Sequence, residues 1–138
     1  MRIATAALVL AWLVVLSCYD VRERRLPNLL TMPGAGAILL AAAVAGRGLP
    51  AAAGAATLAG LYLLVHLVAP AGMGAGDVKL AIGVGGLTGC FGAGVWFVAA
   101  LAAPLLTALW GLLRGTRTVP HGPGMCVATA GAVSLVLL

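Results

Sequence analysis

The sequence predicts an all-α integral membrane protein, a bundle of about six transmembrane helices. Three observations predict this fold class: 63% of the 138 residues are hydrophobic, 8% are charged, and the mean hydropathy is +1.16. Soluble domains carry about 25% charged residues. A transmembrane β-barrel would show segments of about ten residues with alternating hydrophobicity, whereas the apolar runs here are continuous. We therefore expect a single transmembrane domain over residues 1–138.

Six apolar segments separated by short polar links define the expected helices. They cover residues 3–19, 29–45, 51–69, 78–89, 92–113 and 124–138. The first is close to the roughly 17 residues that a helix needs to cross a bilayer. A signal peptide is the alternative for this segment, but several more spans follow it. Pro33 lies near the start of the second segment, where we expect a kink or break.

The fourth segment is short and rich in glycine. It contains Gly83, Gly85, Gly86 and Gly89, and the spacing of Gly85 and Gly89 is typical of close helix contacts in membranes. Because residues 78–89 are too few for a full span, we expect this segment to be re-entrant, tilted or partly unwound. A membrane tolerates such backbone only where protein or a water-filled cavity covers it.

The charged residues predict the orientation of the chain. If the first polar link is cytoplasmic, the third and fifth links are cytoplasmic too, because an even number of spans separates them. Those links hold six of the eight basic side chains, namely Arg22, Arg24, Arg25, Lys79, Arg114 and Arg117. This asymmetry follows the positive-inside rule, so we expect both termini outside. It also accounts for the net charge of +5 without a nucleic-acid partner.

The cysteines do not indicate a metal site. Cys18, Cys90 and Cys126 each lie in or beside an apolar segment, and none has a CxxC partner. Neither a zinc site nor a disulfide framework is therefore expected, and buried, small apolar side chains are the better interpretation. We expect no cofactor.

Two aspartates are the candidate reactive groups. Asp77 belongs to residues 72–79, GMGAGDVK, and is one of only three acidic residues in the chain. A carboxylate at the centre of a membrane helix costs about 2.5 to 3.5 kcal/mol, so Asp77 needs a partner or a function. Counting spans places Asp20 at the same membrane face, which makes it the most plausible partner.

This pair of carboxylates has two interpretations. In the first, Asp20 and Asp77 form an acid–base dyad that shares one proton, because two carboxylates about 3 Å apart cannot both ionise. In the second, they are charges at helix ends that pair with Arg22, Arg24 or Lys79. The three glycines around Asp77 favour the dyad, since they leave room for an extended peptide to approach.

Three motifs carry a resemblance to a known family. They are DxR followed by LPN in residues 20–28, GMGxGDxKL in residues 72–80, and PxGP in residues 120–123. In order, spacing and placement at one membrane face, the chain resembles the type IV prepilin peptidases, the GxGD-type aspartic proteases. The resemblance extends over nearly the whole chain.

The resemblance implies six helices and a catalytic pair formed by Asp20 and Asp77, without a metal. It implies that the protein removes the short basic leader of prepilins or pilin-like proteins at the cytoplasmic face of the inner membrane, cutting after a glycine. Only nine residues separate Tyr19 from Leu29, so the cysteine-rich insertion of the larger members is missing. Methyltransferase activity is therefore not expected, and the chain is similar to the short, peptidase-only members of Tad/Flp-type pilus systems.

Four further residues are candidates for supporting the dyad or binding substrate. Arg22 and Lys79 each lie two residues after an aspartate, and membrane-surface anchoring is the equal alternative for both. Gly74 and Gly76 are expected to set the loop conformation, with close helix packing as the alternative. His121 stands where the family often has an aromatic residue.

Two other functions compete with a peptidase. One is a proton-coupled transporter subunit that uses the two carboxylates as a relay, although such acids favour the midplane of the bilayer and an inverted repeat. The other is a non-catalytic assembly subunit, which would need neither aspartate.

Overall fold

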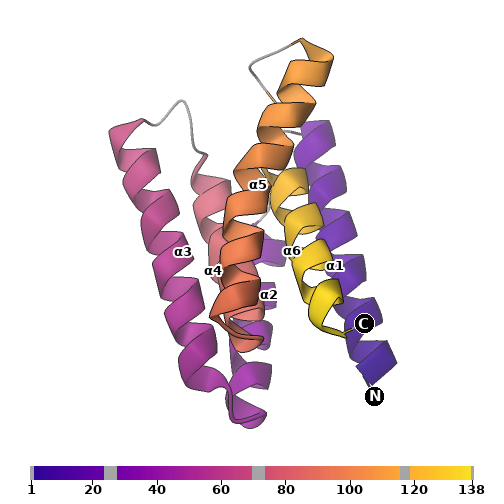
Figure 1. The fold of residues 1–138 in the computed structure, drawn as a ribbon, viewed down its shortest axis with the longest axis vertical. Helices are drawn as coiled ribbons and strands as arrows, with labels where there is room; N and C mark the ends of the chain where they lie inside the picture. Colours follow the sequence, from indigo (N-terminus) through magenta and orange to yellow (C-terminus); the bar gives the residue numbers. More distant parts are fainter. Residues whose placement is uncertain (1, 24–27, 70–73, 116–118, 138) are drawn as a thin grey trace.

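The chain is a bundle of antiparallel α-helices (Figure 1). The computed structural model describes residues 2–23, 28–69, 74–115 and 119–137. Within them it contains six helices and no strand: α1 (Arg2–Glu23), α2 (Asn28–Val44), α3 (Gly48–Val68), α4 (Ala75–Cys90), α5 (Ala93–Arg114) and α6 (Gly122–Leu137). The predicted all-α fold class is confirmed.

The helices run alternately up and down, so their ends gather at two ends of the bundle (Figure 1). One end carries the C-termini of α1, α3 and α5 and the N-termini of α4 and α6, and we call it the polar end. The two chain termini lie at the other end. Asp20 and Asp77 therefore lie at the same end of the bundle, as counting spans predicts.

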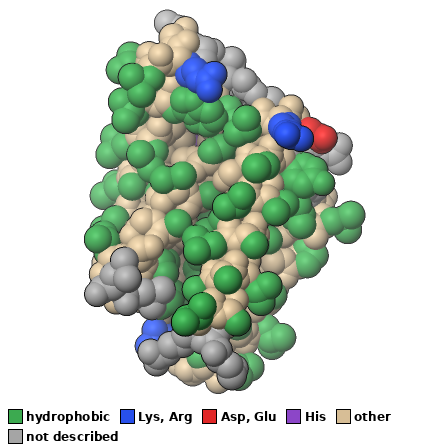
Figure 2. Space-filling model, turned by 90° about the vertical axis from the view of Figure 1, so that its right-hand side faces the viewer, with side chains coloured by type: hydrophobic (Ala, Val, Ile, Leu, Met, Phe, Trp, Pro, Cys, Tyr) green, Lys and Arg blue, Asp and Glu red, His purple; other side chains and the backbone are tan. Residues whose placement is uncertain are grey.

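The outside of the bundle is suited to lipid. Within the described part of the chain, three helical stretches are long and apolar enough to cross a membrane, Ile3–Glu23, Gly48–Val68 and Ala93–Arg114, and α2 and α6 are shorter apolar helices. Figure 2 shows one face on which hydrophobic side chains cover the middle, while charged side chains lie near the ends. Large hydrophobic side chains such as Leu105 and Leu112 are exposed, which in water would be unfavourable. The protein is thus a helical membrane protein.

Helix α4 is the most enclosed part of the structure. It is a continuous helix of 16 residues, so among the expected alternatives the partly unwound segment is wrong. Most of its residues from Leu80 to Gly89 are buried. Since α2, α3 and α5 surround it, α4 needs fewer residues than a helix that faces lipid along its full length (Figure 1).

Glycine allows α3 and α4 to approach closely. A Cβ atom on Gly89 would lie 2.7 Å from the carbonyl oxygen of Pro50, and one on Gly85 would collide with the carbonyl oxygen of Gly54. The close contact predicted from the spacing of Gly85 and Gly89 is confirmed, with α3 as the partner. Trp96 of α5 donates its indole N–H to the Gly54 carbonyl at 3.0 Å.

Trp12 of α1 fixes the start of α2. Its indole N–H donates to the carbonyl of Leu30 at 2.8 Å, in the turn that precedes Pro33. Its ring lies against the backbones of Gly34 and Gly83, where any side chain would collide with it. Pro33 lies inside α2, which continues through it rather than breaking there.

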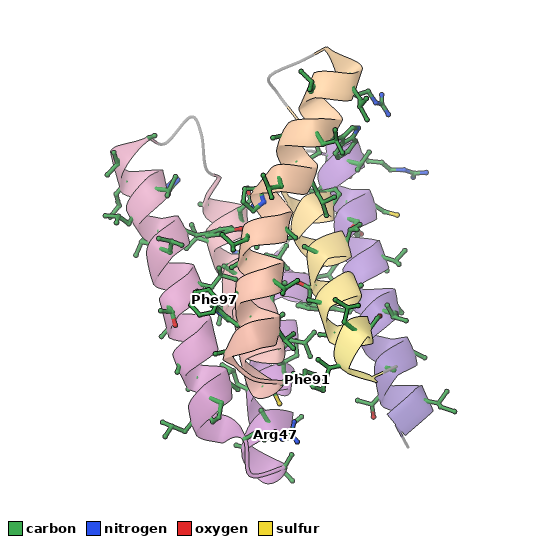
Figure 3. All side chains as sticks on the ribbon, in the orientation of Figure 1. Arg47, Phe91 and Phe97 are labelled. Carbon is green, nitrogen blue, oxygen red and sulfur yellow. The ribbon has the colours of Figure 1, made fainter. Side chains whose placement is uncertain are left out.

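At the end opposite the polar end, a hydrogen bond joins the link between α2 and α3 to the end of α4. Arg47 lies there, between α2 and α3 (Figure 3), and its guanidinium donates to the carbonyl of Cys90 at 3.2 Å.

The cysteines are not all buried, although the sequence predicts that they are. Cys126 is buried, but Cys18 is exposed on α1, where a small apolar side chain can face lipid instead of the core.

Candidate active site

Asp20 is a buried carboxylate held by the beginning of α6. It lies in the last turns of α1 and is 6% exposed. Its Oδ2 atom accepts a hydrogen bond of 2.7 Å from the backbone N–H of Gly122, the first residue of α6. The N-terminus of a helix carries free N–H groups and partial positive charge, so it favours a carboxylate at this place.

Gly122 is needed here because the carboxylate is so close. A Cβ atom on residue 122 would collide with the Asp20 carboxylate. The third motif, PxGP, therefore supplies both the donor and the space for Asp20. This link joins residues that are 102 positions apart in the sequence.

Asp77 lies in the first turn of α4, ahead of the apolar stretch that begins at Val78. The N-cap residue is Gly74, and the backbone N–H of Asp77 donates to the Gly74 carbonyl at 3.1 Å. In return, the Asp77 carboxylate accepts a hydrogen bond from the backbone N–H of Gly74. Gly74 has no side chain to complete a capping box, so the contact supplies only the half in which the side chain of the third helical residue reaches back to the N-cap N–H.

The charge of Asp20 affects the pKa of Asp77. Burial raises the pKa of Asp77, and the negative charge of Asp20 raises it further, to about 7, against the opposing effect of the Gly74 N–H. A pKa near neutrality means that Asp77 is often protonated when Asp20 carries a charge. Around neutral pH the pair can therefore carry one proton and one negative charge.

Lys79 and Arg22 are placed differently from the carboxylates. The Lys79 amine donates to the side-chain oxygen of Asn28 at 2.8 Å. This bond joins the start of α4 to the start of α2, and so links two of the three motifs. Arg22 is exposed in the last turn of α1, where a cation interacts favourably with the helix dipole.

The two glycines proposed to set the loop have different surroundings. Gly74 has φ −76° and ψ 150°, an extended conformation open to any residue, and its Cβ position lies 3.6 Å from the Asp77 carboxylate. Gly76 is part of the first turn of α4. Gly72 and Met73 of the same motif lie outside the described residues.

A chain of polar side chains lies beside the carboxylates. His121, just before α6, accepts or donates one hydrogen bond of 2.8 Å with the Tyr62 hydroxyl of α3 and one of 2.7 Å with the Thr107 hydroxyl of α5. Tyr62 is also close enough to Asp77 for the two groups to interact electrostatically. Burial lowers the pKa of His121 to about 4, so the ring is neutral at physiological pH.

The direction of these hydrogen bonds follows from the donors available. The Thr107 hydroxyl gives its hydrogen to the carbonyl of Ala103 at 3.0 Å, so it accepts the Nδ1–H of His121. The Nε2 atom of the neutral ring is then an acceptor, and Tyr62 donates to it. The chain thus runs from Tyr62 through His121 and Thr107 to Ala103.

The sequence indicates only part of this site. Gly122 belongs to a motif that the sequence shows, and His121 stands out as a departure from the family pattern. Tyr62 and Thr107 lie inside apolar segments and carry no motif. Only the relative rotation of α3 and α5 brings them to His121.

The comparison with protein families gives one match. The family model described as the type IV leader peptidase family matches residues 7–112, which include both Asp20 and Asp77 and end before His121. No curated protein and no solved structure matches the chain.

Proposed function

This chain belongs to the type IV leader peptidase family, and we propose that it is a membrane aspartic endopeptidase whose catalytic groups are Asp20 and Asp77. The observation that carries the proposal is that these two carboxylates lie at the polar end of the bundle, close enough for the charge of Asp20 to raise the pKa of Asp77. Each is held at a helix start by a backbone N–H, Asp20 by Gly122 and Asp77 by Gly74.

The proposed reaction needs only water and the shared proton. The ionised carboxylate takes a proton from water, and the resulting hydroxide oxygen attacks the carbonyl carbon of the scissile peptide bond. The protonated carboxyl gives its proton to the carbonyl oxygen, which forms a neutral tetrahedral intermediate. When the C–N bond breaks, the dyad gives a proton to the leaving amine and takes a hydroxyl proton from the intermediate, which becomes the new carboxylic acid. The pair is then singly protonated again.

The proposed substrate is a prepilin or pilin-like protein with a short basic leader, cut after a glycine. The supporting argument is location: the carboxylates lie at one end of a helical bundle, so a substrate helix can remain in lipid while its leader reaches the water-exposed border. Arg22 and Arg114 at the polar end and Arg47 at the other support a cytoplasmic site in the inner membrane. A short, peptidase-only role, as in Tad-type pilus systems, fits a chain with no large insertion between α1 and α2.

The test is co-expression with a prepilin, followed by gel analysis of leader removal. Asp20→Asn and Asp77→Asn keep the size of each side chain but remove its acidity. We expect the parent to process the precursor and both variants to lose at least 1,000-fold in rate, on the order of what loss of a catalytic group costs. Normal membrane insertion of each variant is checked by detergent extraction.

Glu23→Gln is the matched control, because Glu23 is an exposed acid on the same helix as Asp20. It should process the precursor at the parent rate. Processing that survives both aspartate substitutions would contradict the dyad. Proton uptake by vesicles containing the parent, without any cleavage, would instead favour a transporter.

A further inference from the structure

The beginning of α6 is held by the side chain that precedes it. The His121 ring is bonded at both nitrogens, to Tyr62 of α3 and to Thr107 of α5. Tyr62 also packs against it, with ring centroids 5.5 Å apart. A ring that is bound on two sides by two helices has little freedom to rotate or shift.

The backbone of the same residue starts the hydrogen-bond ladder of α6. The carbonyl of His121 accepts the N–H of Met125 at 3.1 Å, which makes His121 the residue from which the helix begins. The next N–H, that of Gly122, has no partner within the helix and donates to Asp20. The ring that α3 and α5 hold and the N–H that binds Asp20 therefore belong to adjacent residues of one backbone.

We propose that His121 is a positioning residue, which Tyr62 and Thr107 hold so that the Gly122 N–H meets the Asp20 carboxylate. The role of this contact in catalysis rests on the function proposed above. His121 lies beyond the residues that the family model matches, so the inference comes from the contacts of this chain. It extends the site from two carboxylates to a support that connects α3, α5 and α6.

A role in packing alone would not require these donors and acceptors. A partly buried imidazole that loses one partner is left with an unpaired polar group, which is unfavourable away from water. An apolar aromatic ring would fill the same space and has no polar atom that could be left unpaired. The chain instead uses every polar atom of the ring, which fixes its orientation as well as its position.

The first test measures the contact without using activity. Hydrogen–deuterium exchange of the full chain in detergent micelles is read on a peptide that covers residues 119–125. Pro120 and Pro123 have no amide hydrogen, so few amides besides that of Gly122 contribute. We expect Thr107→Val and Tyr62→Phe to speed exchange of this peptide at least tenfold, because α6 then starts from a less constrained residue.

Matched controls exist for both variants. Thr57→Val removes a hydroxyl that bonds a helix carbonyl in the same way, at an exposed place on α3. Tyr19→Phe removes an exposed phenol near the same end of the bundle. Both should exchange like the parent. Exchange in the Thr107 and Tyr62 variants that equals that of the controls would overturn the proposal.

The second test separates positioning from binding. With a purified precursor that carries a short basic leader, a glycine and an apolar helix, we expect Thr107→Val, Tyr62→Phe and His121→Phe to lower kcat at least tenfold, with KM within twofold of the parent. His121→Gln keeps an acceptor and a donor and should recover part of kcat. His121→Phe combined with Thr107→Val should be no worse than His121→Phe alone.

The outcomes distinguish this inference from the proposed function. If the parent cleaves and the three variants cleave with the kcat of the controls, His121 has no positioning role and the peptidase proposal stands. If the parent does not cleave at all, the proposed function fails, and the exchange experiment still decides whether His121 holds the Gly122 N–H.

Discussion

At the scale of single residues, Gly122 is the position most sensitive to a small change. Its N–H binds Asp20, and a methyl group on its Cα would collide with the carboxylate that it binds. We expect Gly122→Ala to reduce leader removal at least tenfold, because the Asp20 carboxylate must move away from the N–H that binds it. The measurement is the rate of processing in detergent.

Gly131→Ala is the control for this prediction. Gly131 lies in the same helix, and an added Cβ there meets nothing within 4 Å. This variant should keep the parent rate, and alanine should slightly stabilise the helix. Equal activity of the two variants would show that the close contact at Gly122 is not needed.

The raised pKa of Asp77 predicts the pH dependence of the reaction. With a pKa of about 7, the carboxyl keeps its proton below neutral pH and loses it above. The dyad then carries two negative charges and has no proton to give to the substrate carbonyl. We expect kcat/KM to fall about tenfold for each pH unit above roughly 7. A rate that stays constant up to pH 9 would contradict the shared proton.

At the scale of helices, the packing of α3 on α4 depends on the absence of side chains. Gly85 and Gly89 of α4 bring its backbone against Gly54 and Pro50 of α3. We expect Gly85→Val to destabilise the protein by about 1 to 3 kcal/mol, the usual cost of overpacking, or more if the helices separate. Thermal unfolding in detergent measures the effect.

Gly60→Ala provides the comparison for this helix pair. Gly60 lies on α3, and an added Cβ there meets nothing within 4 Å. The melting temperature of the Gly60→Ala variant should match or exceed that of the parent. A melting temperature for Gly85→Val equal to that of Gly60→Ala would mean that close approach of α3 and α4 does not stabilise the fold.

How far the sequence predicts these elements depends on the kind of contact. The number of helices and the shared end of Asp20 and Asp77 follow from hydropathy and from counting spans. The continuity of α4 does not follow from hydropathy, since the length of residues 78–89 alone suggests a re-entrant, tilted or partly unwound span. Only the close approach of α3 reveals that protein covers this helix. The partners of His121 depend on helix rotation, which no local pattern in this chain encodes.

At the scale of the whole molecule, the distribution of charge predicts its orientation. We expect an alkaline phosphatase fused after Leu138 to be active and a green fluorescent protein fused there to be dark, because the charge distribution predicts that the C-terminus lies outside. A fusion after Gly115, at the polar end, should give the opposite pattern. Fluorescence from the fusion after Leu138 would place the aspartates outside and contradict the proposed cytoplasmic site.

The bond between Asp20 and Gly122 has a consequence for how the enzyme is made. The carboxylate is synthesised with the first helix, whereas its partner N–H belongs to the last one. During synthesis, the first five helices can enter the membrane while Asp20 still lacks this donor. The proposed site is therefore complete only after α6 has inserted, so we expect a chain truncated before residue 122 not to cleave its substrate.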